Sequence, residues 1–526
     1  MKWLVTLLLF SLGAKAQQYD LIISQGKIID GTGNSWYYGD IGIQGGKISA
    51  IGHLNPTDAK RTISARGLVV APGFIDVHTH IENSVFQKPT ADNFIFDGVT
   101  TVVTGNCGSS FTEGVGIFLH RVDSATSSIN IATLVGHNTI REAVMQRAQR
   151  DPTAAEQQEM EKLAQKAMEE GAAGLSTGLI YIPGTYSATP EIIGLAKVIQ
   201  ANQGIYASHM RNEGDDVDGA IAETINIGRV TGIPVEISHF KVSGQKNWGG
   251  STRTLSLVKE ARKEGLDITI DQYPYTASST NLHVLLPTWV MAGGTDSANF
   301  RLLDPVIHEK IKAEMHSSAK KGKLKNYNYA VVANCPADTT INGKTISAIT
   351  RLQGKKSTLN NDIETVLTIL LKGGAQMIYH SMQETDVQNI MRYPFNMIAS
   401  DAGIIYLPNS VPHPRGYGTN ARVLAKYVRE TNLIQLEDAI RRMTSLPAQK
   451  FHLQNRGLIK PGMAADLVIF DPLTIRDNST YSDPHHFSSG FSYVLVNGII
   501  TLENNQHNGN KAGKAIYNQS HTGKIP

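Results

Sequence analysis

The stretch APGFIDVHTHIE, residues 71–82, carries an apolar strand into two histidines that are separated by one residue. In a β-strand, residues i and i+2 point to the same face, so the side chains of His78 and His80 can reach the same ion. Such a pair is weak evidence by itself in a chain with 17 histidines. Its place at the carboxyl end of a strand makes it a candidate half of a metal site.

Short apolar segments recur along the chain and alternate with amphipathic or loop segments. They are TTVVTGN, NIATLVGHN, AAGLSTGL, GIYASHM, IPVEISHF, LDITIDQYPY, AQMIYHSM and FNMIASD. This alternation is typical of βαβ units. It predicts an α/β fold built on a metal-dependent (β/α)8 TIM-like barrel.

A metal-ligating or acid/base side chain follows four of these segments: Cys107, His209, His239 and Asp401. The carboxyl ends of barrel strands face the active-site mouth. One histidine in such a place is more often a hydrogen-bonded core residue than a ligand. All four residues and the histidine pair occupy the same kind of position at a strand end. Together they are therefore more readily explained as metal ligands than as core residues.

These residue types suit one kind of chemistry. Imidazole and thiolate are good zinc ligands, and an open coordination position lets a bound water ionise near neutral pH. A carboxylate beside the metal, here Asp401, can take up the proton and pass it to a leaving amine. The residues therefore indicate metal-assisted hydrolysis.

Composition sets the outer bounds. The chain has 526 residues, of which 41% are hydrophobic and 18% are charged, which is ordinary for a globular protein that holds a barrel and a smaller domain. The net charge is +3 and no basic run is present. Nucleic acid is therefore not an expected partner.

Residues 1–16 have the pattern of a secretory signal peptide, with Lys2, an apolar run and an Ala-Lys-Ala cleavage site. The apolar run is shorter than the roughly 20 residues that a membrane-spanning helix needs. No cysteine follows the cleavage site, which disfavours a lipoprotein. We expect an exported protein, periplasmic or secreted, with no membrane attachment after cleavage.

Export makes the two cysteines, Cys107 and Cys335, informative, because an oxidising compartment favours disulfides. The two could pair. The strand-end context favours a metal-bound thiolate for Cys107. Cys335, in VVANCPAD, is expected to be an inert buried thiol.

The predicted domains follow changes in the pattern of strand-like and helix-like segments along the sequence. Short strands broken by glycines at residues 17–72 and 451–526 predict a small β-sandwich built from both chain ends. Residues 73–450 form the catalytic barrel. A segment at about 285–356 interrupts the strand-helix rhythm and predicts an insertion at the barrel mouth that shapes the substrate pocket.

Local motifs carry a family resemblance over residues 19 to about 500. They are GFIDVHTH (73–80), TGNCGSS (104–110), GHNTIR (136–141), GLSTGLIYIPGTYS (174–187), ASHMRNEGDD (207–216), ISHFKVSG (237–244), DQYPYTASST (271–280), IASDAG (398–403) and HPRGYGT (413–419). With them the chain resembles the D-aminoacylase (N-acyl-D-amino-acid deacylase) family of the amidohydrolase superfamily. Cys107 stands where most dinuclear members of that superfamily have a carboxylated lysine.

The resemblance implies zinc-dependent hydrolysis of N-acyl-D-amino acids to a D-amino acid and a carboxylate, with Asp401 as the general acid/base. It implies a tightly bound zinc ion on three residues and a second, weaker position on three others, and one zinc ion is often enough in that family. The tight set is Cys107, His209 and His239, and the weaker set is His78, His80 and Asp401.

The resemblance also implies how a small-molecule N-acyl-amino acid is held. Lys241 and Arg415 would meet the substrate carboxylate, since a planar guanidinium suits it bidentately and an ammonium supplies a point charge. Tyr181, Tyr275 and Ser279 would shape the pocket or donate hydrogen bonds to the substrate.

Two alternatives stay open. The substrate could be another amide, such as a D-residue dipeptide or a cyclic amide, although cyclic amidases usually need the bridging lysine that Cys107 replaces. The chain could also be a non-catalytic metal-binding relative, which the presence of Asp401 beside every metal ligand disfavours.

Overall fold

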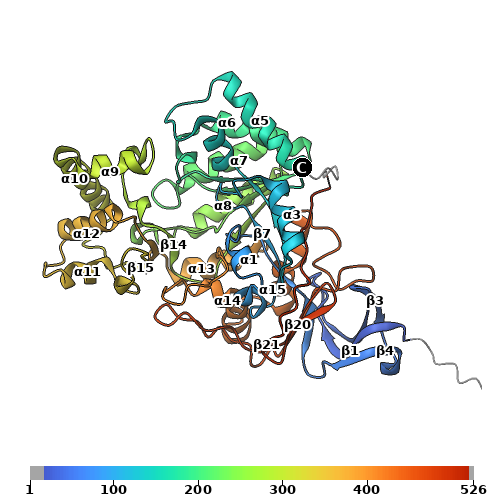
Figure 1. Ribbon diagram of the computed structural model, residues 1–526. Coiled ribbons are helices and arrows are strands. Elements are labelled where there is room, and N and C mark those ends of the chain that lie inside the picture. The colour runs from blue at the N-terminus through green and yellow to red at the C-terminus, as the bar shows by residue number, and fades with distance from the viewer. Residues whose placement is uncertain (1–16, 520–526) are drawn as a thin grey trace, which may run out of the picture.

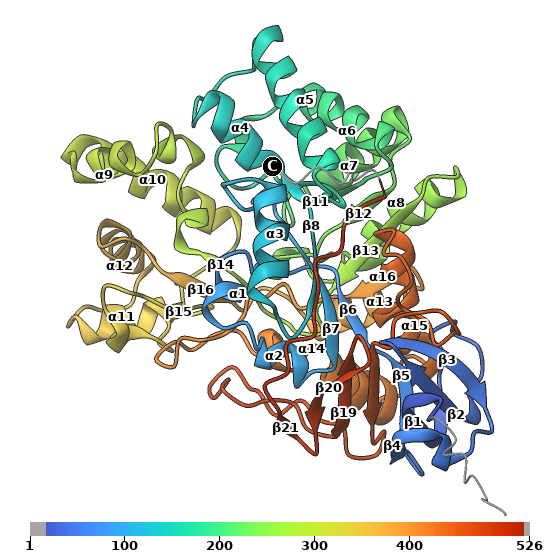
Figure 2. The same ribbon diagram turned by 45° about the vertical axis from the view of Figure 1, so that its right-hand side comes forward.

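The computed structural model describes residues 17–519, and it has a central barrel with a β-sheet on one side and a helical insertion on the other (Figures 1 and 2). The signal peptide expected at residues 1–16 lies outside the described residues. Within residues 17–519, no helix has both the length and the apolar character needed to cross a bilayer.

The barrel strands are all parallel and follow the chain order. They are β6 (Phe74–Asp76), β7 (Val99–Thr104), β8 (Asn130–Thr133), β9 (Val135–Gly136), β10 (Gly174–Gly178), β11 (Ile205–His209), β12 (Val235–Ile237), β13 (Ile268–Gln272) and β17 (Asn396–Ile398). β8 and β9 share one position and are interrupted only at Leu134. A bridge between Thr79 and Ala402 closes the ring. The predicted TIM-like barrel is confirmed.

Helices cover the outside of the barrel, so strands such as β7 and β10 are buried along their whole length. The helices are α1 (Ser84–Gln87), α2 (Asp92–Ile95), α3 (Val115–Ala125), α4 (His137–Met145), α5 (Ala154–Glu169), α6 (Thr189–Ala201), α7 (Val217–Thr231), α8 (Ser251–Lys263), α13 (Glu384–Met391), α14 (Arg415–Arg422), α15 (Leu436–Met443) and α16 (Ser445–Lys450). Local sequence sets their starts. At α5, Thr153 and Glu156 form a reciprocal capping box.

Both chain ends contribute to one nine-stranded sheet beside the barrel. Its strands are β1 (Tyr19–Ile28), β2 (Tyr37–Gln44), β3 (Lys47–Gly52), β4 (Ala59–Ser64), β5 (Val69–Pro72), β18 (Leu467–Phe470), β19 (Phe491–Val496), β20 (Ile499–Glu503) and β21 (Gln506–His507). The ends meet where β5 pairs antiparallel with β18. Ile23, Ile41 and Leu467 pack in the apolar core of this sheet. The domain limits at residues 72 and 450 stay a prediction.

The insertion is longer than predicted. It runs from β14 (Ser278–Asn281) through β15 (Ala330–Asn334) to β16 (Gln376–Tyr379), which pair antiparallel, and it has its own apolar core. Its helices are α9 (Thr295–Leu303), α10 (Pro305–Lys321), α11 (Ile346–Leu352) and α12 (Leu359–Leu371). The prediction of AQMIYHSM as a barrel strand is wrong, because a short buried run looks the same in either sheet.

A buried cluster of three side chains, called the Glu191 cluster here, fastens α4 to α6. Glu191 Oε1 lies 2.7 Å from His137 Nε2, and the same carboxylate pairs with the Arg141 guanidinium. Arg141 also donates to the carbonyl of Arg150 at 2.7 Å. Burial would raise the pKa of Glu191, but the bonds and charges of His137 and Arg141 lower it. The GHNTIR motif therefore has a structural role here.

Candidate metal centre

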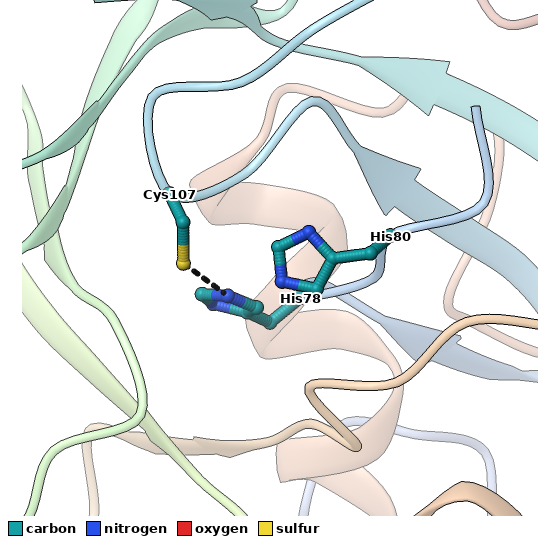
Figure 3. A group of neighbouring side chains, drawn as sticks. All are labelled: His78, His80 and Cys107. Carbon is teal, nitrogen blue, oxygen red and sulfur yellow. Dashed lines mark hydrogen bonds between the residues drawn. The ribbon is translucent and has the colours of Figure 1, made fainter. Parts of the chain in front are cut away.

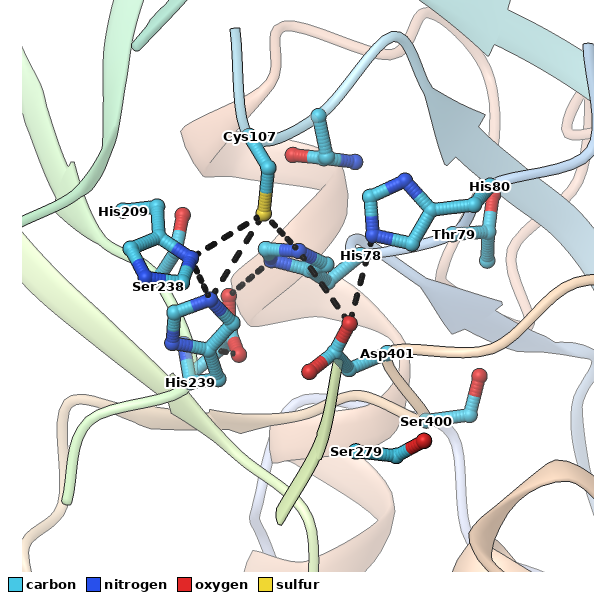
Figure 4. Close-up of polar contacts among 12 residues, drawn as sticks. His78, Thr79, His80, Cys107, His209, Ser238, His239, Ser279, Ser400 and Asp401 are labelled. Atoms are coloured by element: carbon cyan, nitrogen blue, oxygen red, sulfur yellow. Dashed lines mark hydrogen bonds and ion pairs between the residues drawn. The ribbon is translucent and has the colours of Figure 1, made fainter. Parts of the chain in front are cut away.

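The metal-ligand cluster consists of six side chains at or just beyond the carboxyl ends of barrel strands (Figure 4). β6 precedes His78 and His80, β7 precedes Cys107, β11 ends on His209, β12 precedes His239, and β17 precedes Asp401. The structure thus brings together every residue that the strand-end pattern singled out.

Three of these residues have an unusual backbone. The φ angles are 52° at Cys107, 37° at His239 and 51° at Asp401, in the left-handed region that non-glycine residues rarely adopt. Each such conformation costs about 1–3 kcal/mol and persists only where the surrounding structure enforces it. Gly178 on β10 leaves room for one of these turns, since a Cβ there would lie 2.0 Å from the Cys107 carbonyl oxygen.

The thiol of Cys107 lies at the centre of the cluster. Its Sγ is 3.3 Å from His78 Nε2 (Figure 3), 3.4 Å from His209 Nδ1 and 3.6 Å from His239 Nε2. The two ring nitrogens of His209 and His239 are 2.7 Å apart. Four atoms that can each offer a lone pair therefore converge on one small volume.

Asp401 closes the other side of the cluster. Its Oδ1 is 3.2 Å from His80 Nε2 and 3.7 Å from His78 Nε2, and its Oδ2 is 2.8 Å from Arg415 Nη1. Burial alone would raise the pKa of Asp401, but the Arg415 charge and the His80 hydrogen bond hold it well below the usual value. Asp401 is therefore held in its ionised form.

The ligand atoms form three groups, each small enough to hold one ion. One is the set expected for the tight position: Cys107, His209 and His239. The set expected for the weaker position is not found as one group. Its members divide instead between the groups His78, His80, Cys107 and His78, His239, Asp401.

The donor chemistry of the cluster fits a divalent metal ion. Burial would raise the pKa of Cys107, but the charge of His78 and hydrogen bonds from His209 and His239 lower it well below the usual value, which favours the thiolate. Burial and the neighbouring His239 lower the pKa of His209, which favours a neutral ring with a free lone pair. Thiolate and neutral imidazole are the forms that bind zinc-like metals.

Asp271, at the end of β13, holds two of the ligands in place and was missed from the sequence. Its Oδ2 is 3.3 Å from His78 Nδ1, and its Oδ1 accepts a hydrogen bond of 2.7 Å from the His239 backbone N–H. A carboxylate behind a ligating imidazole fixes the ring and raises its basicity. The strand-end rule, applied to LDITIDQ, could have found it.

Glu213 was also missed, and it links Lys241 to the cluster. Glu213 Oε1 accepts a hydrogen bond of 2.5 Å from Lys241 Nζ and lies 2.9 Å from His239 Nδ1. Burial would raise the pKa of Glu213, but the charges of Lys241 and His239 lower it. Glu213 follows β11 in a loop, where strand periodicity gives no signal.

A cavity of about 620 Å³ opens onto the metal-ligand cluster. Of the residues predicted to bind substrate, Lys241, Arg415, Tyr181 and Ser279 line it. The Arg415 guanidinium donates to the Ser279 carbonyl at 3.3 Å. Both predicted cations therefore face the same space as the candidate metal ligands.

Tyr275 is the exception and is a correction. Its hydroxyl donates to Asp477 Oδ2 at 3.0 Å, and its ring lies against Arg422, away from the cavity lining. The chain turns after β13, where the Tyr275 N–H bonds to the Tyr273 carbonyl. Tyr273 lines the cavity instead, with its ring centroid 4.5 Å from Arg415 Cζ.

Comparison with known proteins places this site in a family. The Amidohydrolase family profile matches residues 61–306 and 307–502. This chain belongs to the Amidohydrolase family. It is 35% identical over 524 residues to the D-aminoacylase of Alcaligenes xylosoxydans xylosoxydans. The match covers 95% of this chain and 98% of that relative. The resemblance to the D-aminoacylase family is confirmed.

Solved structures of such amidohydrolases have the same fold. A crystal structure of D-aminoacylase matches with a TM-score of 0.81 at 35% identity, covering 95% of this chain and 100% of the other. The N-acyl-D-glutamate deacylase of Bordetella bronchiseptica matches with a TM-score of 0.82 at 34% identity, covering 95% and 99%. The latter structure is a complex with zinc and a phosphonate that mimics the tetrahedral intermediate of the reaction.

Proposed function

We propose that this protein is a zinc-dependent N-acyl-D-amino-acid deacylase, which hydrolyses the amide bond to release a D-amino acid and a carboxylate. The observation that carries the proposal is the grouping of Cys107, His209 and His239 at the cavity floor, in a chain 35% identical to a D-aminoacylase over 95% of its length. We also propose export to the periplasm or medium, supported by the pattern of residues 1–16.

Cys107, His209 and His239 would hold the zinc ion. Asp271 holds the backbone of His239, and Glu213 orients its ring. A zinc ion bound there supplies Lewis-acid chemistry, because it polarises a carbonyl group and lowers the pKa of water. His78 and His80 border the same volume and would be further ligands for a second ion.

Asp401 would move the proton. Its carboxylate lies beside His78 and His80 and borders the cavity, so it can take a proton from the attacking water. It can then give the proton to the leaving amine, whose departure completes the hydrolysis. A positioned carboxylate of this kind contributes about 10²–10⁴-fold to the rate.

Arg415 and Lys241 would bind the carboxylate of the substrate. Both are almost fully buried and both lie near the Tyr273 ring, at 4.5 Å and 5.7 Å from its centroid. A carboxylate bound between them would place the neighbouring amide beside the metal-ligand cluster. The hydroxyl of Tyr181 and the backbone of Ser279 complete this wall of the cavity.

The test is hydrolysis of paired N-acetyl-D- and N-acetyl-L-amino acids by the mature protein, with the L-enantiomer as the matched control. Chelator should abolish release of the D-amino acid, and added zinc should restore it. Preference for the L-enantiomers, or turnover that survives complete metal removal, would contradict the proposal. Absence of turnover on all N-acetyl-amino acids, together with turnover of D-residue dipeptides or cyclic amides, would favour those substrates instead.

A further inference from the structure

We propose that the enzyme selects substrates with a neutral side chain, apolar or uncharged polar, over substrates with an acidic or a basic one. This inference rests on the deacylase function proposed above and names the substrate class of the same cavity. It follows from the charges that line the cavity and from the partners that those charges already have.

Four lining residues carry a full charge once the histidines and Cys107 are set aside: Glu213, Lys241, Asp401 and Arg415. They form two ion pairs, Lys241 with Glu213 at 2.5 Å and Arg415 with Asp401 at 2.8 Å. Among residues 17–519, the lining has no other lysine, arginine, aspartate or glutamate. The cavity thus offers no cation beyond the two that stand beside the metal-ligand cluster.

These two cations are tied to the reacting end of the substrate. Lys241 Nζ is 2.8 Å from His239 Nδ1, and Arg415 contacts Asp401 directly. The α-carboxylate of an N-acyl-amino acid is next to the scissile amide, so it occupies the neighbourhood of these two residues. A second carboxylate on the substrate side chain would find both cations engaged.

His413 is the remaining imidazole in the lining outside the metal-ligand cluster, and its hydrogen bonds make it neutral. Its Nδ1 accepts from the Arg415 backbone N–H at 3.0 Å, so its proton is on Nε2, which donates to the Ala277 carbonyl at 2.9 Å. Both ring nitrogens are used, and protonation of Nδ1 would break the first bond. His413 therefore offers no positive charge to a ligand.

The outer wall of the cavity is neutral and partly apolar. Polar residues of the insertion strands, such as Thr280 and Asn334, and residues of an apolar loop after β17 both line the cavity. Tyr406 and Leu407 on that loop are each 44% exposed, so they present apolar surface that a bound side chain can cover. The apolar lining residues include Ile180, Ile404, Ile405, Tyr406, Leu407 and Pro412.

Transfer of a charged side chain into such surroundings costs free energy unless a partner of opposite charge compensates it. An acidic side chain would lie near Glu213 and Asp401 without a free cation. A basic side chain would have to compete with Lys241 and Arg415 for the same two carboxylates. A neutral side chain has neither problem and gains the burial of apolar surface.

Isosteric substrate pairs test this inference. N-acetyl-D-glutamine against N-acetyl-D-glutamate, and N-acetyl-D-asparagine against N-acetyl-D-aspartate, differ in charge at nearly constant shape. We expect kcat/KM to be about 100-fold higher for the neutral member of each pair, since an uncompensated charge is penalised on that scale. N-acetyl-D-methionine should likewise exceed N-acetyl-D-lysine.

A designed variant supplies the missing cation. Gln376 lies in the cavity wall on β16 and donates to Ser279 Oγ at 3.0 Å. Gln376→Arg should raise the glutamate-to-glutamine ratio of kcat/KM at least tenfold, whereas the uncharged control Gln376→Met should leave that ratio unchanged.

The outcomes separate the two levels of the argument. Equal or higher kcat/KM for the acidic or basic substrates in the unmodified enzyme would overturn the side-chain inference and leave the deacylase function intact. Absence of turnover on every D-amino acid derivative in the panel, with zinc bound, would overturn the proposed function itself. A glutamate-to-glutamine ratio that Gln376→Arg does not change would contradict the assignment of this wall to the substrate side chain.

Discussion

The metal-ligand cluster and the Glu191 cluster both bury imidazole and carboxylate groups in the same barrel, yet their atoms are arranged differently. In the Glu191 cluster, the charges face one another, with Glu191 between His137 and Arg141. In the metal-ligand cluster, lone pairs from Cys107 and the histidines converge on one volume that borders a cavity. Burial of titratable groups is therefore no sign of function by itself, whereas convergence of lone pairs beside open space is.

The largest expected effect is on catalysis, from Asp401→Asn. The amide cannot accept the proton, so kcat should fall by about 10³-fold. Metal bound by Cys107, His209 and His239 should remain at wild-type stoichiometry. Kinetics and metal analysis on the same preparation check both, and loss of the tightly bound metal would mean that Asp401 is a required ligand.

Breaking the Glu191 cluster should destabilise the fold instead. Glu191→Gln leaves the buried Arg141 charge uncompensated, which costs about 3 kcal/mol of unfolding free energy. The matched control is Glu142→Gln on α4, the helix that carries Arg141, where the Glu142 carboxylate pairs with Arg147 at the surface and contributes at most about 1 kcal/mol. Denaturant unfolding measures both variants. Loss of metal from folded Glu191→Gln protein would contradict the purely structural role assigned to the Glu191 cluster.

Asp271→Asn tests the layer behind the metal ligands. Without the carboxylate, His78 loses its partner and His239 loses a charged acceptor for its backbone N–H, so metal affinity should fall by about 10–100-fold. Competition with a chelator of known affinity measures the change. Asp296→Asn, an exposed aspartate in the insertion, should bind metal as the unmodified protein does.

The smallest effect is spectroscopic and concerns the thiol of Cys107 in metal-free protein. Its lowered pKa means that the thiolate persists at pH values below about 8.5, the usual pKa of cysteine. In Cys335→Ala, where Cys107 is the remaining cysteine, the ultraviolet thiolate band should therefore persist below pH 8. Disappearance of the band between pH 9 and pH 8 would contradict the assignment.

Much of the barrel and its strand-end residues could be predicted from the sequence because both depend on local patterns. A buried parallel strand reads as an apolar run, and each ligand lies at the carboxyl end of a strand or within four residues after it. β16 was misassigned because pairing partners are set by tertiary structure, which a run such as AQMIYHSM does not encode. The same limit explains the insertion bounds, which depend on β14 pairing with β16 across 94 residues or more.

The errors at the site have the same physical origin. Tyr273 and Tyr275 are two residues apart and would share a face in a strand, but the turn after Gln272 sends Tyr275 to Asp477. Glu213 reaches His239 from a loop, so no periodicity announces it. The possible pairing of Cys107 with Cys335 is also wrong, since both are free and buried, one in the barrel and the other in the insertion.

The most direct test of the central claim compares the two cysteines. Metal content and N-acyl-D-amino acid turnover should be measured in Cys107→Ala and in Cys335→Ala, each against the unmodified protein. We expect Cys107→Ala to lose the tightly bound metal and its turnover, and Cys335→Ala to keep both. Full metal content and activity in folded Cys107→Ala would contradict this expectation.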